Sequence, residues 1–336
     1  MKALVYEGVE TLAVRDIAAP TPATGEHLVR IHASGICGSD MHAYLGHDDR
    51  RPAPLVLGHE AAGVVETGPL QGKKVTINPL VSCGTCDMCR VGRENICADR
   101  QIISMPPREG AFAEYVAIPE ANLVYVPDTF PLEKAALCEP LAVSWHAAKL
   151  ALKNQPDDPP QRALVFGGGA IGLGAALALK AMGLTDIEIV DPNPLRRDFI
   201  KARCKLHAAP APQASAPVVI DAVGYAATRA AASEWVTPGG VIVHVGLGEN
   251  TGGIDVRRLT LQEITFVGSY TYTAQDFRET AQAMFEGRLG MLDWFDVRPL
   301  HEGAQAFRDI RAGTTAAPKI VLDPRSQPVH ERTSDV

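Results

Sequence analysis

Four of the seven cysteines in this sequence of 336 residues lie close together, at the spacing C-x2-C-x2-C-x7-C. Turn-forming residues separate Cys83, Cys86, Cys89 and Cys97. Four thiolates can form the closed tetrahedral shell of a structural Zn²⁺ ion, although an iron–sulfur cluster uses the same type of ligand. The spacing therefore predicts a metal site, zinc rather than free buried thiols. A closed shell leaves no position for a substrate, so this site does not by itself explain an activity.

A second motif that could do chemistry is the pattern G-x-G-x-x-G, formed by Gly167, Gly169 and Gly172. It follows the apolar run ALVF and opens an apolar, helix-like run. In that context a dinucleotide pyrophosphate binds at the helix N-terminus. Asp191 lies 19 residues beyond Gly172. A carboxylate at about this interval accepts a hydrogen bond from the adenosine ribose and repels a 2′-phosphate, which favours NAD over NADP.

Two arginines after this aspartate, Arg196 and Arg197, could partly offset the repulsion of a 2′-phosphate. Further cofactor contacts are expected at the carboxyl ends of the later apolar runs, where ligands of open α/β sheets bind. The candidate cofactor-binding residues are Gly167, Gly169, Ala170, Ile171, Gly172, Asp191, Arg196, Val223, Gly246, Leu247, Ser269 and Tyr270.

The elements that must position these motifs differ between the two parts of the chain. Residues 1–140 contain short β-like runs separated by Gly and Pro, and the first 17 residues alternate like an edge strand. This pattern of short strands and turns indicates an antiparallel, barrel-like β domain. After a helix-like run at 136–152 and the polar, linker-like 153–162, apolar strand-like and helix-like runs alternate, which predicts a parallel sheet covered on both faces. Residues 208–217 are expected to form an irregular surface connection.

The composition excludes several classes of protein. Hydrophobic residues make up 46% and charged residues 21%, and no apolar run approaches the roughly 18 residues of a membrane span. The formal net charge of −7 argues against binding to nucleic acid. The N-terminal residues lack the apolar block of a signal peptide, and clustered cysteines bind metal more readily than they pair in a reducing compartment. A cytoplasmic location, without a membrane or nucleic-acid partner, is therefore expected.

Taken in order, the motifs GICGSDMHAY, LGHEAAG, the cysteine cluster, EPLAV and the glycine pattern resemble those of the zinc-dependent medium-chain dehydrogenases. The resemblance covers roughly residues 1–325. The motif sequences are most similar to those of the polyol branch, which includes sorbitol, idonate and threonine dehydrogenases. The resemblance implies an α/β plus β fold in which a GroES-like β-barrel catalytic domain contains an inserted, doubly wound parallel Rossmann domain. The implied catalytic domain spans 1–144 and includes a structural zinc lobe at 80–100. The implied NAD-binding Rossmann domain spans 145–272. Residues 273–336 would return to the catalytic domain, with a frayed tail from about 326.

The same resemblance implies a catalytic zinc, whose ligands are too scattered in the sequence to convince alone. Cys37 and His59 would bind it, with Glu60 or Glu139 as the third ligand. Cys138 is interpreted as a packed side chain rather than a ligand. Asp40 would be the acid that orients the His59 ring for zinc binding, without itself binding the zinc. The resemblance also assigns a proton relay through Ser39 and His42, and a substrate pocket lined by Tyr44, Phe112 and Tyr272.

The implied activity is NAD-dependent and zinc-dependent oxidation of a secondary alcohol, in a polyol or sugar-derived substrate, to a ketone, and the reverse. Thr271 stands where polyol enzymes often carry an arginine, which weakens sorbitol as the substrate. Arg50 and Arg51 could attract an anionic group, although a solvated loop is the preferred interpretation of 46–54. A zinc-ribbon regulator that senses NAD or binds nucleic acid, and a zinc-free quinone reductase, remain as alternatives. A homodimer or homotetramer is expected because relatives commonly form them.

Overall fold

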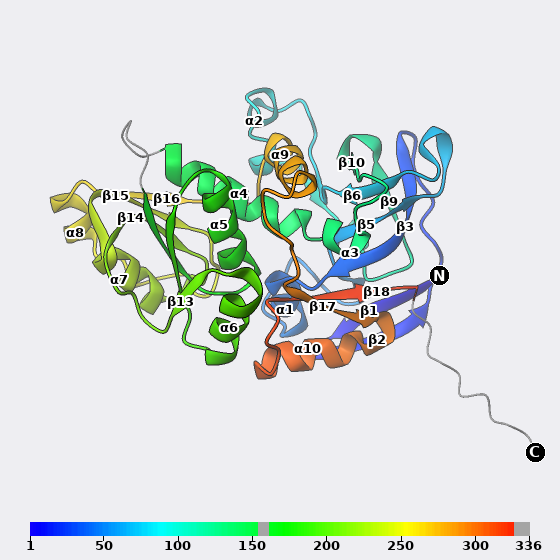
Figure 1. The fold of residues 1–336 in the computed structure, drawn as a ribbon. Helices are drawn as coiled ribbons and strands as arrows, with labels where there is room; N and C mark the ends of the chain where they lie inside the picture. The colour runs from blue at the N-terminus through cyan, green and yellow to red at the C-terminus, as the bar shows by residue number, and fades with distance from the viewer. Residues whose placement is uncertain (154–160, 326–336) are drawn as a thin grey trace, which may run out of the picture.

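The computed structural model describes residues 1–153 and 161–325. A parallel sheet with its helices forms one end of the molecule and a β-rich part forms the other, as Figure 1 shows. Residues 154–160 of the linker expected at 153–162 lie outside the described residues, whereas Lys153 ends a helix and Arg162 begins a strand. The tail expected from about 326 also lies outside them. No helix in the described part of the chain is both long and apolar enough to cross a membrane.

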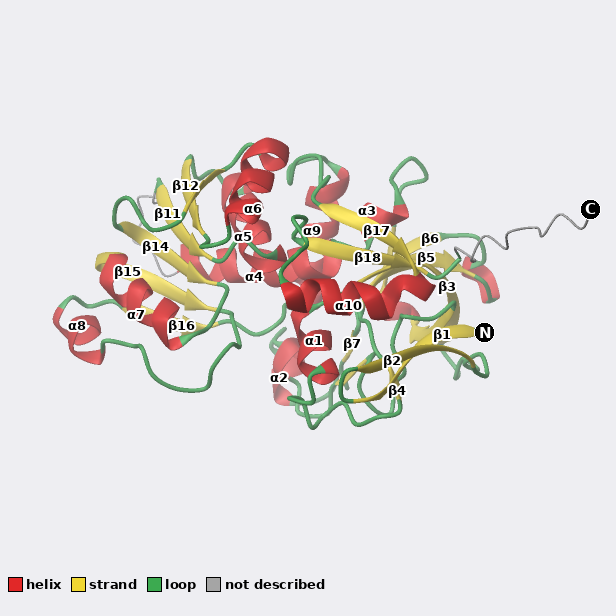
Figure 2. Ribbon diagram, turned by 90° about the horizontal axis from the view of Figure 1, so that it is seen from below, coloured by secondary structure: helices red, strands yellow, loops and turns green. Residues whose placement is uncertain are grey.

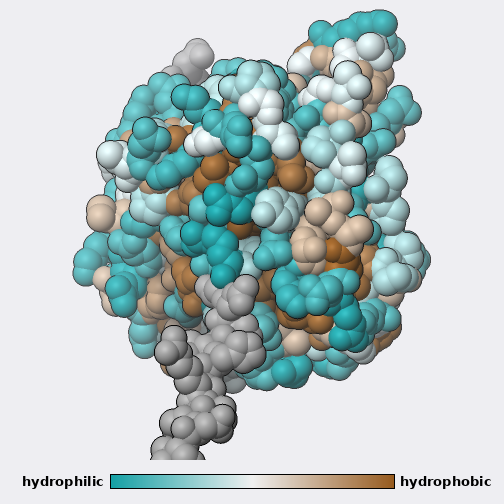
Figure 3. Space-filling model, turned by 90° about the vertical axis from the view of Figure 1, so that its right-hand side faces the viewer, coloured by the Kyte–Doolittle hydropathy of each residue, from teal (hydrophilic) through white to brown (hydrophobic). Residues whose placement is uncertain are grey.

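The β-rich part is built around a sheet of seven strands in the order β10-β6-β5-β3-β18-β17, with β9 also paired to β3. Residues of β3 alternate between buried and partly exposed, as expected of a strand with one face on a core. Figure 3 views this part from outside and shows hydrophilic residues over much of that face, with hydrophobic groups between them. The strands of this part are β1 (Lys2–Gly8), β2 (Thr11–Asp16), β3 (Glu26–Gly35), β4 (Leu55–Val56), β5 (Glu60–Val65), β6 (Lys74–Ile77), β7 (Leu80–Val81), β8 (Gln101–Ile102), β9 (Tyr115–Pro119), β10 (Leu123–Tyr125), β17 (Phe295–Pro299) and β18 (Lys319–Asp323).

The N-terminal residues form a hairpin rather than a single edge strand. The first strand, β1, pairs with both β2 and β4, so it is the central strand of a small sheet and β2 is at its edge. The sequence pattern missed the turn between the strands because alternation continues through both of them.

The sheet that precedes and follows the glycine pattern has six strands, all parallel, in the order β13-β12-β11-β14-β15-β16. Numbered from its first strand, this is the 3-2-1-4-5-6 order of a doubly wound dinucleotide-binding sheet. Part of the expected irregular connection at 208–217 belongs to this sheet, since Ala208 and Ala209 end β13 and Ala216 begins β14. Its strands are β11 (Arg162–Phe166), β12 (Asp186–Val190), β13 (His207–Ala209), β14 (Ala216–Asp221), β15 (Val236–His244) and β16 (Thr265–Gly268).

Two helices, α4 and α9, lie between the two ends of the molecule, and Figure 2 shows the same arrangement from below. The expected domain boundary at 144/145 falls inside α4, which packs against both α5 and α9. The return of the chain is also visible, because β18 pairs with β3. The helices are α1 (Gly38–Tyr44), α2 (Asp87–Arg90), α3 (Leu132–Ala135), α4 (Cys138–Lys153), α5 (Ala170–Ala181), α6 (Pro194–Phe199), α7 (Ala226–Trp235), α8 (Val256–Leu261), α9 (Ala274–Phe285) and α10 (Gly303–Ala312).

Candidate active site

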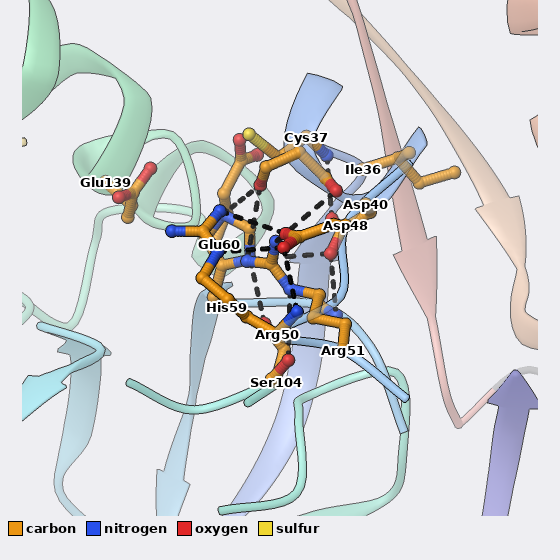
Figure 4. A network of polar contacts seen from close by, with 12 residues as sticks. Ile36, Cys37, Asp40, Asp48, Arg50, Arg51, His59, Glu60, Ser104 and Glu139 are labelled. Atoms are coloured by element: carbon orange, nitrogen blue, oxygen red, sulfur yellow. Dashed lines mark hydrogen bonds and ion pairs between the residues drawn. The ribbon is translucent and has the colours of Figure 1, made fainter. Parts of the chain in front are cut away.

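The register of β3 against β5 assembles the first group of candidate ligands. Gly35 is paired with Glu60, so the turn that follows β3 lies beside the residues that begin β5. Cys37 caps the N-terminus of α1 in that turn, and its backbone N–H donates to Oδ2 of Asp40 at 3.0 Å. The ligand atoms of Cys37, His59 and Glu60 all lie within 4.8 Å of one another. Figure 4 shows these side chains converging from different segments.

Buried polar groups fix the orientation of His59. Its Nδ1 lies 3.2 Å from the hydroxyl of Ser104 and 3.5 Å from Oδ1 of Asp40, which is fully buried. This leaves Nε2, which is 3.5 Å from Oγ of Ser39, as the nitrogen that could hold a metal. Burial lowers the pKa of His59, but the negative charges of Asp40 and Cys37 outweigh that effect and raise the pKa well above its ordinary value.

Glu60 has one carboxylate oxygen engaged and one without a protein partner. Lys319, which begins β18, donates from Nζ to Oε1 of Glu60 at 2.6 Å and to the backbone oxygen of Ile36 at 2.8 Å. The other oxygen, Oε2, is buried with no hydrogen-bond partner among the described residues. It approaches β3 so closely that a Cβ on Gly35 would lie 2.0 Å from it. A buried, unsatisfied anionic oxygen next to a thiol and an imidazole fits a divalent cation.

Glu139 approaches the same region from α4, as Figure 4 shows, but it has a different partner. The hydroxyl of Tyr272 donates to its Oε1 at 2.9 Å. Burial and the negative charge of Glu60 raise the pKa of Glu139 to about 7, against the opposing effects of His59 and Tyr272. Cys138 is fully buried and its thiol contacts the backbone oxygen of Phe277, which agrees with its interpretation as a packed side chain.

The cysteine lobe, defined here as residues 83–97, brings its four sulfurs together. The Sγ atoms are 3.9 Å apart for Cys83 and Cys89, 3.5 Å for Cys86 and Cys89, and 3.5 Å for Cys97 and Cys83. Ligands of a tetrahedral zinc at the usual Zn–S length of about 2.3 Å would be roughly 3.8 Å apart. All four cysteines are free thiols, so the lobe could hold a metal with a closed shell.

The glycine loop has the geometry that a pyrophosphate site requires. Gly167 has φ +97, and a Cβ on Gly172 would lie 1.8 Å from the backbone oxygen of Gly167. Gly169 caps α5 and faces open space. The carboxylate of Asp191 accepts from the backbone N–H of Gly168 at 2.7 Å, so it lies beside the loop. A carboxylate in this position can meet an adenosine ribose.

The arginines that follow Asp191 are oriented differently. Arg197 donates to the backbone oxygens of Asp191 and Pro192, at 2.8 and 2.7 Å. Arg196 packs against the loop, where its Cγ would lie 3.1 Å from a Cβ on Gly168. Burial lowers the pKa of Arg196.

A cavity of about 410 Å³ lies between the two parts of the molecule. Both the candidate metal group and the carboxyl ends of the parallel strands contribute to its walls. The expected site residues that line it are Cys37, Ser39, His42, His59, Glu139, Ile171, Val223, Gly246, Leu247, Ser269, Tyr270 and Tyr272.

Two residues expected in the substrate pocket are elsewhere. Tyr44 and Phe112 do not line the cavity formed by the described residues; both are buried in the core of the β-rich part and pack on Phe307. Tyr44 ends α1 on the side that faces this core, which the spacing from Cys37 alone does not reveal.

Sequence reasoning also missed contributors to the site. Arg51 was expected on a solvated loop but is only 3% exposed and lines the cavity. Ser104 and Lys319 carry no motif, and they reach the site only through the packing of distant segments.

Comparison with known proteins identifies the class that this fold and site define. The alcohol dehydrogenase GroES-like domain matches residues 23–128, and the zinc-binding dehydrogenase domain matches residues 205–286. The chain belongs to the zinc-binding, medium-chain alcohol dehydrogenases and is an oxidoreductase.

Individual relatives identify the branch. The chain is 30% identical to a probable D-xylulose reductase A of Neosartorya fischeri, over 92% of this chain and 93% of the relative. It is 32% identical to L-galactonate-5-dehydrogenase of Escherichia coli K12, over 86% and 88%. An alcohol dehydrogenase of Escherichia coli CFT073, solved with NADH, superposes with a TM-score of 0.86 at 25% identity, covering 96% of this chain and 99% of that one. The chain is thus a member of the polyol dehydrogenase branch.

Proposed function

We propose that this protein oxidises a secondary alcohol of a polyol or sugar-derived substrate to a ketone with NAD⁺, and catalyses the reverse reaction. The observation that carries this proposal is the shared cavity, which is lined both by Cys37 and His59 and by residues 269–272. Residues 269–272 directly follow β16, at the edge of the sheet where a dinucleotide binds. An alcohol in the cavity would therefore have its reacting carbon between the metal group and the nicotinamide.

We assign a catalytic zinc to Cys37, His59 and Glu60, and a structural zinc to the four cysteines of the lobe. The assignment of Glu60 over Glu139 is supported by the position of its carboxylate within 4.8 Å of the ligand atoms of Cys37 and His59, and by its buried Oε2, which has no partner among the described residues. When bound, a zinc with an open position supplies Lewis acidity, which lowers the pKa of an alcohol. Asp40 holds the His59 ring so that Nε2 faces the cavity.

The proton released from the alcohol is proposed to leave through Ser39 and His42. The hydroxyl of Ser39 lies 3.5 Å from Nε2 of His59, next to the position of the reacting oxygen. His42 is one helical turn further on, lines the same cavity and is partly exposed to solvent. An imidazole can accept the proton from Ser39 and return it to water.

Among possible substrates, the cavity favours one that carries a carboxylate. Asp48 pairs with both arginines: Arg51 through Nη1 at 2.5 Å, and Arg50 through Nε at 2.8 Å and Nη2 at 3.0 Å. Two guanidinium groups that line the cavity thus share one carboxylate, so these three side chains together carry a net positive charge. A sugar acid would complement this charge better than a neutral polyol does.

The remaining assignments concern the cofactor and the cell. NAD is preferred over NADP because Asp191 would repel a 2′-phosphate. A cytoplasmic location is proposed because clustered cysteines bind metal more readily than they pair in a reducing compartment. A homodimer or homotetramer is proposed by analogy with the family.

A substrate panel with metal analysis tests the proposal. Polyols, sugar acids and sugar phosphates are assayed by absorbance at 340 nm with NAD⁺ and NADP⁺ in parallel. We expect turnover with NAD⁺, two zinc ions per chain, and loss of turnover in Cys37→Ser with the fold retained. Full activity of Cys37→Ser would refute the zinc-dependent mechanism. A clear preference for NADP⁺ would refute the role given to Asp191.

A further inference from the structure

One short segment links the cofactor sheet to α9 and also forms a wall of the cavity. This segment, residues 269–274, contributes Ser269, Tyr270, Thr271 and Tyr272 to the cavity lining. The hydroxyl of Tyr272 also donates to Oε1 of Glu139 at 2.9 Å. The shape of this wall therefore depends on the backbone conformation of a few residues.

The backbone of this segment adopts a conformation that its own sequence disfavours. Thr271 has φ +46, in the left-handed region that β-branched residues rarely occupy. Such a conformation persists when surrounding contacts impose it. The segment must therefore be held by contacts from outside itself.

Two of those contacts come from the cysteine lobe. Asn95 donates from Nδ2 to the backbone oxygen of Tyr270 at 2.8 Å. Glu94 accepts from the backbone N–H of Ala274 at 2.7 Å. The two bonds lie on either side of Thr271. Both donor and acceptor come from the short helical turn Glu94–Ile96, which ends directly before the ligand Cys97.

A third contact involves the side chain of Tyr270 in the same segment. The guanidinium of Arg100 lies 5.1 Å from the ring centre of Tyr270, in a cation–π contact. Arg100 is itself anchored to the lobe, because Nη1 donates to the backbone oxygen of Cys97 at 2.7 Å. Each of the three contacts therefore connects the wall of the cavity to residues next to one metal ligand.

We propose that the cysteine lobe positions the wall of the active site, through Glu94 and Asn95 as positioning residues. The lobe then has a role in binding NAD(H) and substrate as well as in stability. Without these tethers Thr271 can relax towards an ordinary conformation, and Tyr270 and Tyr272 move with it. The effect on binding rests on the proposed function, whereas the tether itself does not.

Hydrogen exchange tests the tether directly. In Glu94→Ala the amide of Ala274 loses its acceptor, so we expect peptides that contain residues 269–274 to exchange faster. Glu94→Gln keeps an acceptor oxygen and should restore protection. Arg90→Ala is the matched control, since Arg90 lies exposed on the same lobe and its ion pair is with Asp87 in that lobe. Unchanged exchange in Glu94→Ala would overturn the tether.

Binding of NADH, followed by its fluorescence, tests the coupling to the site. We expect Asn95→Ala and Glu94→Ala to raise the Kd for NADH and the substrate KM by about five- to tenfold, with a smaller effect on kcat. Zinc analysis should still find two ions per chain, which separates lost positioning from lost metal. Faster exchange with an unchanged Kd for NADH would overturn the positioning role. A wild-type chain that bound no NADH would instead refute the proposed function, and the exchange result would still decide the tether.

Discussion

Nζ of Lys319 lies 2.6 Å from Oε1 of Glu60, and both side chains are almost completely buried although 259 residues separate them in the chain. The contact exists because β18 returns to pair with β3 beside the turn that carries Cys37. It occupies one oxygen of Glu60, and the other, which has no partner among the described residues, is available to the proposed metal. The C-terminal strand thereby helps to define the ligand set.

Substitution of each glutamate tests which of them binds the catalytic metal. In Glu60→Gln the amide can still accept from Lys319 but lacks the charge that a cation requires. We expect the zinc content to fall from two ions towards one per chain, and kcat/KM to fall about a hundredfold or more. Glu139→Gln should keep both ions. The opposite pattern of zinc contents would assign the metal to Glu139.

Removing the buried lysine is expected to destabilise the fold. Lys319→Met leaves Glu60 as a buried carboxylate without its counter-charge, which typically costs about 3 kcal/mol or more in the free energy of unfolding. Urea unfolding of the zinc-loaded protein measures this loss, and Lys319→Arg should recover part of it. A loss below about 1 kcal/mol would mean that the metal alone compensates the charge.

The contact between α4 and α9 predicts a pH dependence of stability. Asp276 accepts from Nδ1 of His146 at 2.7 Å and from Nζ of Lys149 at 2.6 Å. Burial acts to raise the pKa of Asp276, but hydrogen bonds from His146, Lys149 and Thr273 outweigh it and hold the pKa well below its usual range. Because the unfolded chain binds this proton more tightly, the stabilisation is present above about pH 4 and is lost as the pH falls through the folded pKa.

We therefore expect Asp276→Asn to lower the free energy of unfolding by about 2 kcal/mol at pH 6, with the difference shrinking below pH 4. Unfolding curves of both proteins across this range measure it. The exposed Asp296 offers a control, since Asp296→Asn should have little effect at any pH. A difference that stays constant with pH would contradict the electrostatic origin of the effect.

Charge on the cavity wall predicts discrimination between substrates. Arg50→Met removes one of the two guanidinium groups that share Asp48. We expect kcat/KM for a sugar acid such as L-galactonate to fall about tenfold, with a much smaller change for xylitol. Arg50→Lys keeps the charge and should behave closer to the wild type. Equal losses for both substrates would argue against recognition of a carboxylate.

Local patterns in the sequence were sufficient for the fold class and for two of the motifs. The glycine pattern and the cysteine cluster are each contiguous in the sequence, so residue type and spacing alone predict their local geometry. The structure has a close turn at the glycines and, separately, the four cysteine sulfurs near one another. Alternation of strand-like and helix-like runs likewise predicted the parallel sheet. The N-terminal hairpin was missed because a turn between two alternating strands leaves little trace in the pattern.

The catalytic group required the tertiary structure, since its members come from strands that are distant in the sequence. The pairing of Gly35 with Glu60 and the return of β18 decide which carboxylate oxygen is free, and neither follows from local propensity. Packing likewise directs Tyr44 into the core and Arg51 to the cavity. Residue types and short spacings determined which chemistry this protein can support. Long-range strand register determined which side chains meet at the site, because register decides which residues of neighbouring strands lie side by side on one face of the sheet.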